Sequence, residues 1–422
     1  MKKRHLIAFP AAALIAGSTL NAQSVNPDLN QAASKVDLSG SYVELNRVDG
    51  DIQLLTEYLQ LIVEVARKNG EDIPENFDIA KLMTATGLDS LKATAMSNTK
   101  QGDIWLNQAY LQTDGSGIFS IVGETNKQYT APTMCPAGTD LALQLTLDLR
   151  KAPEIARKVA ESVGKKDTLE SQITMELPDL GLSIEDSLKK SHTVLNLAID
   201  LDPTKTIALG ENKMPRPNLV ARADGLVWLW DKFGDELIQS QGMPLKKTEK
   251  DGVITYAVPE DMAPALQGYA PLLVVDKNKD QIWVASSADF LAKSQTSGQQ
   301  LADDPAFKAA WAGMPATGNS MAYISKELVN QLETLYKTAE KEGLLNDEDF
   351  QKAKPLIDRL IQDLTKPKTG YVFAFGNDGS GIHLANKTAF PSKYGRYLQS
   401  AMPIIEKFQK EKCEKDKDSH EE

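Results

Sequence analysis

The sequence predicts an α+β fold, in which helices pack against mainly antiparallel sheets. A short alternating strand followed by an amphipathic helix occurs four times along the chain. Further strand segments follow each pair and are separated by polar turns. The sequence Asp-Gly-Ser-Gly-Ile at Asp114–Ile118 recurs at Asp378–Ile382, which supports an origin by duplication.

The four strand–helix pairs are recognised by a change of hydrophobic period from two residues to about 3.6. In the first helix, for example, Ile52, Leu55 and Leu59 recur at helical spacing. Asp224 is the predicted N-cap of the third helix. The strands span residues 40–45, 138–145, 218–222 and 318–324, and the helices span 51–68, 155–163, 226–240 and 326–341.

The strands that follow the helices complete the four units. Asp-Gly is a strong signal for a tight turn, because glycine adopts positive φ without a steric penalty. The acidic spacing of the repeated Asp-Gly-Ser-Gly segment does not match a calcium loop, and no lysine follows it as in a phosphate loop. We therefore interpret both copies as turns. The later strands are predicted at 91–96 and 104–111, 192–201, 272–275 and 281–285, and 370–375 and 381–385.

The repeats predict two similar α+β halves. A signal peptide and a flexible lead-in precede them, and a helix with an apolar face and a charged tail end the chain. The predicted boundaries are 1–22 for the signal peptide, 23–38 for the lead-in, 39–212 and 213–410 for the halves, and 411–422 for the tail.

The N-terminus has the layout of a secretory signal. A basic segment at Met1–Arg4 precedes an apolar run at Leu6–Ala16, and the small residue Ala22 precedes Gln23 at the expected cleavage site. The run is shorter than the roughly 20 residues of a membrane-spanning helix, and no cysteine follows it for lipid attachment. No later stretch is long and apolar enough to span a bilayer. The expected location is therefore the periplasm or the extracellular space.

Composition disfavours binding to polyanions. The chain carries a formal charge of −11, and loss of Lys2, Lys3 and Arg4 with the signal leaves 44 basic against 58 acidic residues, a charge of −14. Such a surface repels phosphate backbones and anionic lipid. Partners are expected to be an unknown protein or a small apolar ligand, and no nucleic acid.

The two cysteines, Cys135 and Cys413, could form one disulfide in an oxidising compartment, or remain as two unpaired thiols. Among the histidines, His383 alternates with Ile382 and Leu384 and is expected on the solvent face of a strand. No paired histidines or cysteines at metal-ligand spacing are present. No metal and no cofactor are predicted.

No catalytic residue is predicted. The sequence contains no Gly-x-Ser-x-Gly nucleophile turn and no glycine-rich phosphate loop. A pair of carboxylates for glycoside hydrolysis meets in space and not in sequence, so that possibility stays open. Asp200 and Asp202, near a predicted strand end, are the carboxylates to inspect.

Trp228 and Trp230 form the most unusual local feature and the candidate binding surface. Residues i and i+2 of a helix point about 200° apart, so both indoles cannot face one core. Either the helix is sandwiched between the two halves and buries both indoles, which we favour, or one indole is partly exposed and available to a sugar, a partner or an apolar ligand.

Segments of the third and fourth units resemble a family of exported bacterial proteins known only as a domain of unknown function. The resemblance extends over about residues 272–324 and is carried by Ile282–Ser287, Leu301–Phe307, Met314-Pro315 and Met321–Ile324. It implies export and internal repeats, but no activity and no functional residue.

These features favour a non-enzymatic exported protein that binds a partner or contributes to cell-envelope structure. The alternatives are a periplasmic carrier of an apolar ligand and a carboxylate-dependent hydrolase. A carrier requires a large apolar cavity, and a hydrolase requires two carboxylates roughly 5–10 Å apart in a pocket. An interaction protein requires an exposed apolar patch.

Overall fold

A computed structural model describes residues 26–393, apart from 124–126, 179, 210–211, 241–244, 260, 263–265, 267–268, 344 and 347. The predicted signal peptide, its cleavage site and the C-terminal segment from residue 394 onward lie outside the described residues.

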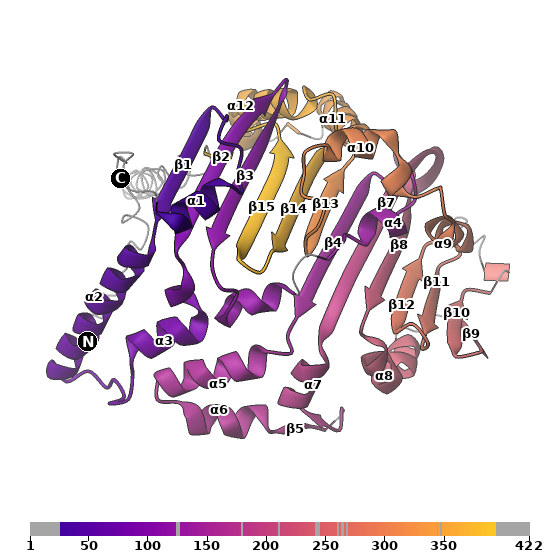
Figure 1. Cartoon of the computed structure of the whole chain (residues 1–422). Coiled ribbons are helices and arrows are strands. Elements are labelled where there is room, and N and C mark those ends of the chain that lie inside the picture. Colours follow the sequence, from indigo (N-terminus) through magenta and orange to yellow (C-terminus); the bar gives the residue numbers. More distant parts are fainter. Residues whose placement is uncertain are drawn as a thin grey trace, which may run out of the picture.

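One antiparallel sheet of 13 strands forms the framework, and the α+β prediction is confirmed (Figure 1). A second sheet is the small pair β5 (Glu176–Leu177) and β6 (Leu182–Ser183). In spatial order the large sheet consists of β1 (Tyr42–Arg47), β2 (Ala93–Gln101), β3 (Ile104–Gln112), β15 (Gly381–Thr388), β14 (Tyr371–Asn377), β13 (Ser320–Ile324), β4 (Leu141–Asp148), β7 (His192–Leu209), β8 (Asn212–Asp224), β12 (Gln281–Ala285), β11 (Leu272–Asp276), β10 (Val253–Ala257) and β9 (Lys246–Lys250).

The order of strands shows that the two predicted halves do not form separate bodies. β13, β14 and β15 of the second half stand between β3 and β4 of the first half. Each predicted unit occupies a continuous stretch of the sheet, in the order first, fourth, second, third. The duplication itself stays a prediction.

Helices lie against the sheet and at both its upper and its lower end (Figure 1). The helix predicted at 326–341 matches α11, whereas α3, α6, α7 and α12 were missed by the sequence patterns. The helices are α1 (Pro27–Ala33), α2 (Asp49–Lys68), α3 (Ile79–Thr86), α4 (Ala131–Met134), α5 (Ala152–Ser162), α6 (Lys166–Ile173), α7 (Ile184–Lys190), α8 (Val227–Ser240), α9 (Ala288–Gln295), α10 (Pro305–Trp311), α11 (Lys326–Lys341) and α12 (Glu348–Thr365), with short 3₁₀ turns η1 (Leu88–Ser90), η2 (Gly117–Val122) and η4 (Leu301–Asp303).

One side of the sheet, which we call the covered face, carries the main core. Helices α4, α9 and α10 and the turn η4 pack there, and α1 packs on the same side of β2 and β3 (Figure 1). Leu301 of η4 and Met321 of β13 are almost completely buried in this core, and Phe307 stacks on Trp311 with 5.4 Å between ring centroids. The opposite side is called the open face.

The β9 edge of the sheet is unsuited to pairing with another chain. β9 has the sequence Lys-Lys-Thr-Glu-Lys, and all five residues are exposed. Charged edge strands of this kind are poor templates for further strand addition. The unpaired edge of β9 is therefore not the surface by which we expect this protein to associate.

Candidate binding surfaces

The open face of β4 is apolar and accessible. Successive strand residues point to opposite faces. Ala142, Gln144, Thr146 and Asp148 are buried on the covered face. The intervening Leu141, Leu143, Leu145 and Leu147 therefore lie on the open face, where Leu145 is 45% exposed and Leu147 is 37% exposed.

Neighbouring strands extend this apolar surface. Leu145 pairs directly with Leu195 of β7, which is 38% exposed, and Leu143 pairs with Leu197. On the other side of β4, Ala322 of β13 lies opposite Leu143. By the same register, the half-buried apolar side chains of the open face also include Ile199, Ile324, Tyr371, Phe373, Phe375 and Leu384.

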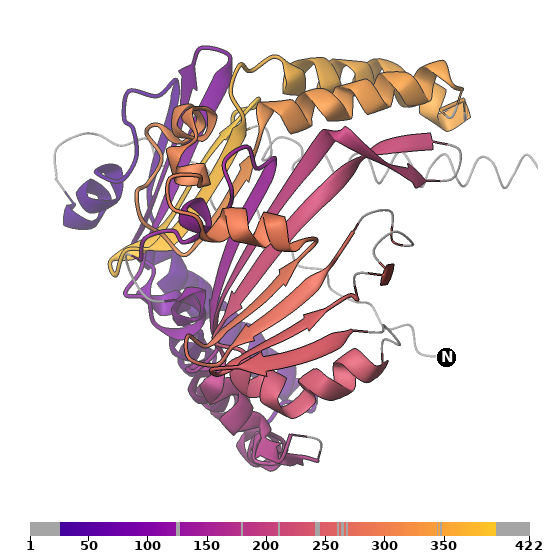
Figure 2. The ribbon, with the colours of Figure 1, turned by 90° about the vertical axis from the view of Figure 1, so that its right-hand side faces the viewer.

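None of the helices in the described part of the chain covers this central part of the open face. α8 packs only at one end, where Val227 and Trp230 join Ile254, Tyr256 and Val275 of β10 and β11. α11 and α12 extend from the upper end of the sheet, away from the side that carries α1 and α10 (Figure 2). Large apolar side chains are also exposed on the helices themselves: Leu54, Tyr58, Leu61 and Val65 on α2, Leu332 and Leu335 on α11, and Leu356 and Leu360 on α12.

A polar cavity of about 850 Å³ lies at the lower end of β3, between α1, α3 and α5. The two Asp-Gly-Ser-Gly segments meet there, because β3 pairs with β15 and Thr113 N donates to Ser380 O at 3.3 Å. The two carboxylates have equivalent roles: Asp114 Oδ1 accepts from Ser116 N at 2.8 Å, and Asp378 Oδ1 accepts from Ser380 N at 3.0 Å. The exact repeat of the sequence Asp-Gly-Ser-Gly-Ile was the signal from which this contact could have been predicted.

The second copy forms the β14–β15 hairpin turn as expected, whereas the first leads from β3 into η2. In the first copy, Gly117 has φ +57°, and a Cβ there would lie 2.2 Å from the backbone of Thr86. Glycine is required at this position by both conformation and close packing. Both segments therefore act as turns with internally bonded aspartates.

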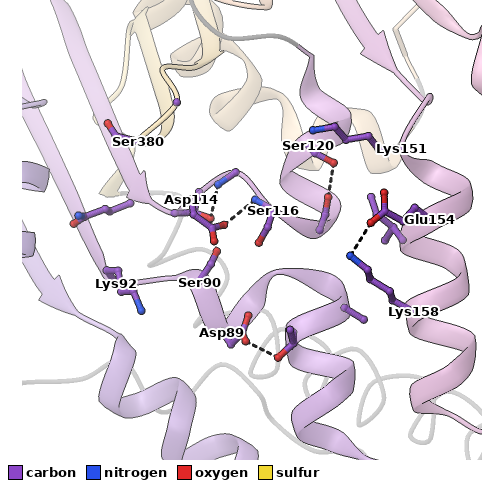
Figure 3. Close-up of a pocket in the computed structure, with 18 of the residues that line it drawn as sticks. Asp89, Ser90, Lys92, Asp114, Ser116, Ser120, Lys151, Glu154, Lys158 and Ser380 are labelled. Carbon is purple, nitrogen blue, oxygen red and sulfur yellow. Dashed lines mark hydrogen bonds and ion pairs between the residues drawn. The ribbon is translucent and has the colours of Figure 1, made fainter.

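Charges of both signs line the polar cavity, and its carboxylates form hydrogen bonds or an ion pair with neighbouring groups (Figure 3). Lys158 Nζ lies 2.8 Å from Glu154 Oε1, and Thr84 Oγ1 donates to Asp89 Oδ2 at 2.6 Å. The hydrogen bond from Ser116 lowers the pKa of Asp114, and that from Lys158 lowers the pKa of Glu154. A glycosidase needs one carboxyl whose pKa is raised so that it can act as an acid, which neither of these groups provides.

The two tryptophans of α8 are in different environments. Trp230 packs edge-on against Tyr256, with 5.7 Å between ring centroids, and belongs to the small core beneath α8. Trp228 is half-buried and lines a cavity, and Lys190 Nζ lies 5.8 Å from the centre of its ring. The expectation that α8 is sandwiched between two halves is wrong, because the helix packs near one end of a single sheet.

Capping of α8 also differs from the prediction. Val227 N donates to Asp280 Oδ1 at 3.0 Å. Asp224 instead pairs with Arg222, whose Nη2 lies 3.1 Å from Asp224 Oδ2. The β11–β12 turn that carries Asp280 is brought to the helix start by strand pairing, which sequence spacing alone could not indicate.

The predicted carboxylates Asp200 and Asp202 belong to β7. Burial raises the pKa of Asp200, while a hydrogen bond from Asn218 Nδ2 at 3.2 Å has the opposite effect. Neither residue lines the polar cavity at the lower end of β3 or the cavity beside Trp228. Among the described residues, no group of three or more His, Cys, Asp or Glu side chains is placed to hold a metal ion.

His383 and Cys135 are both on the covered face. His383 is half-buried opposite Gly376, where burial lowers its pKa, so the expected solvent-facing position is wrong. Cys135 is fully buried in the main core and forms no disulfide with a described residue. Its proposed partner Cys413 lies outside the described residues, so the disulfide stays a prediction.

Comparisons with protein-family models, curated proteins and solved structures find no match for this chain. No described helix is long and apolar enough to cross a membrane. The function is therefore inferred from the chain's own surfaces.

Proposed function

We propose that this is an exported, non-enzymatic binding protein, and that the central open face of the sheet binds a protein partner in the cell envelope. The observation that carries the proposal is the row of leucines that β4 and β7 present to solvent, in particular the exposed pair Leu145 and Leu195. Contiguous apolar surface of this kind is uncommon on a soluble protein unless something binds to it.

The shape of the surface favours a protein over a small apolar molecule. Small ligands are usually bound in concave sites that enclose most of their surface. The 850 Å³ cavity at the lower end of β3 is lined mainly by polar and charged side chains. An extended apolar sheet face is matched by the apolar centre of a protein interface, which buries about 800 Å² on each partner.

The chemistry of the carboxylates supports a role without catalysis. Those of the polar cavity, such as Asp114 and Glu154, form hydrogen bonds or ion pairs with neighbouring side chains or backbone groups. Asp200, whose pKa is raised, is paired with Asn218 outside that cavity. The proposal therefore assigns these carboxylates to structure.

Site-specific photo-crosslinking in the native envelope tests the proposal. A photoreactive amino acid at position 145 is expected to capture one defined protein, and the same group at the exposed Lys308 of α10 is the matched control. Leu145→Lys combined with Leu195→Lys should abolish capture by a probe at position 143 without unfolding the chain. Equal capture from positions 145 and 308, or capture that survives the lysine variant, would contradict the proposal.

Native mass spectrometry of the protein purified from its own envelope separates this function from the carrier. A co-purifying lipid that is lost on mild denaturation would favour the carrier instead. Fractionation and N-terminal sequencing test export, on which a partner in the envelope depends. The expected mature N-terminus is Gln23.

A further inference from the structure

Helix α2 carries apolar side chains on two sides. On one side, Ile52, Leu59 and Val63 join Ile79 and Met83 of α3 in a small core. The other side faces solvent, and each of its large apolar residues is 38–58% exposed. We call these residues the α2 stripe: Leu54, Leu55, Tyr58, Leu61, Ile62 and Val65. A surface helix ordinarily has one apolar side, which it buries against its own core, so the stripe indicates a second partner.

The α2 stripe is accessible and distant from the open-face leucines. Figure 1 shows α2 at the outer edge of the molecule, beyond β1 and beside α3. In the order of the sheet, β4 is the sixth strand after β1, which corresponds to about 29 Å at the usual strand spacing. The stripe is therefore a separate surface from the one that β4 and β7 present.

The central residues of the stripe have the spacing of a coiled coil. Leu54, Tyr58, Leu61 and Val65 follow one another at intervals of four, three and four residues. This alternation keeps the side chains on one line along the helix, so that a second helix with the same spacing can pack against it.

Charged residues continue this line at both ends. Asp51 precedes Leu54 by three residues, and Lys68 follows Val65 by three residues. Both charged residues are exposed, and neither forms an ion pair with another described residue. The line therefore begins with an acidic group, continues through four apolar or aromatic side chains and ends with a basic group.

This line matches itself when its direction is reversed. If two α2 helices pack antiparallel about a twofold axis at the midpoint of the stripe, Tyr58 lies opposite Leu61 of the second copy. Leu54 then lies opposite Val65 of the second copy, and both contacts occur twice in the dimer. Such self-complementarity is what a twofold interface between identical subunits requires.

The charges select the antiparallel direction. In that arrangement each Asp51 lies opposite Lys68 of the second copy, which gives two attractive pairs. A parallel arrangement would instead place Asp51 opposite Asp51 and Lys68 opposite Lys68, and like charges at an interface are repulsive.

We propose that this protein forms an antiparallel homodimer through the α2 stripe. The helix has 20 residues and is about 30 Å long, and a stripe about 10 Å wide provides roughly 300 Å² of projected surface on each copy. A standard interface buries about 800 Å² on each partner, so we expect a weak dimer with a Kd of about 10 µM. The proposal does not depend on the function proposed for the open face.

Sedimentation analysis of the mature protein from about 1 to about 100 µM tests the proposal. We expect a reversible change from monomer to dimer over this range. Leu61→Glu should weaken dimerisation about tenfold or more, because it places a carboxylate in the apolar centre of the interface. Leu332→Glu is the matched control, since Leu332 is on α11 and, like Leu61, is 56% exposed. Circular dichroism verifies that both variants fold.

Exchange of the terminal charges tests the orientation. Asp51→Lys and Lys68→Asp should each weaken dimerisation about fivefold, because each creates two like-charge contacts. The double variant should regain the wild-type Kd to within about twofold. If the single variants acted by destabilising α2, whose acidic start and basic end complement the helix dipole, the double variant would be weaker than either.

Four results would overturn the proposal. They are a chain that stays monomeric at about 100 µM, a dimer that Leu61→Glu does not weaken, equal losses in Leu61→Glu and Leu332→Glu, and a double charge variant without recovery. A monomeric chain would leave the stripe to the segment after Lys393 or to a different protein.

Discussion

Truncation of one leucine on each face of the sheet should lower the free energy of unfolding of the isolated protein by different amounts. Leu301 is completely buried in the main core, whereas Leu145 is 45% exposed. Leu301→Ala removes buried methyl groups and leaves a cavity in the core. The expected loss is about 2–5 kcal/mol of the free energy of unfolding.

Leu145→Ala should have a much smaller effect. Complete burial of a leucine side chain contributes about 1.5–3 kcal/mol to the free energy of unfolding. Because Leu145 is 45% exposed, it contributes only about half of this. The contact with the paired Leu195 adds a few tenths of a kcal/mol up to about 1. Because alanine retains part of these contacts, the expected loss is about 1 kcal/mol or less.

Urea unfolding followed by circular dichroism measures both values, with the slope against urea used to verify that the two variants unfold from equally compact states. Equal losses for Leu145→Ala and Leu301→Ala would refute the reasoning. That result would mean that another part of the same chain already buries the open face, and that the leucines serve stability and not binding.

Three further predictions follow from local geometry. Burial raises the pKa of Cys135 to about 12, so this thiol should not react with an alkylating reagent at pH 8 until urea unfolds the chain, which mass spectrometry can follow. Hydrogen bonds from Arg157, and then from Lys189, lower the pKa of Glu185 to about 2. The stability from this lowered pKa is present above the ordinary glutamate pKa and is lost as the pH falls toward 2, so the difference in urea midpoint between the wild type and Glu185→Gln should shrink over that range. Gly117→Ala should cost more than about 2 kcal/mol because of positive φ and a backbone clash, whereas the control Gly115→Ala, which has positive φ but no clash, should cost about 1 kcal/mol by the same unfolding assay.

Several elements could be predicted from local sequence because their signals are local. The helix at 326–341 was predicted with its observed bounds because the period of its apolar residues is a local signal. The structure adds the cap at its start, where Ser325 Oγ accepts from Leu328 N. Hairpins such as β14–β15 were identified from alternation on both sides of an Asp-Gly turn. The spacing of Trp228 and Trp230 showed that both indoles cannot share one core.

Other features depend on residues that are distant in sequence. Alternation along β4 separates its leucines from Gln144 and Thr146, but only the packing of α4 and α10 decides which set is buried. The cap of α8 comes from Asp280, 53 positions from Val227. In the same way, the Arg222 guanidinium lies 5.4 Å from the ring centre of Trp283 only because β12 pairs with β8.

The sequence by itself determined the α+β class and several of the helices and hairpins, because hydrophobic period and turn chemistry act over a few residues. The tertiary structure alone decided that β13, β14 and β15 enter between β3 and β4, so that one 13-stranded sheet replaces two separate halves. Strand order is set by long-range pairing and burial, for which neighbouring residues carry no signal. Within the described residues, this order leaves one face of β4 and β7 without a helix to cover it.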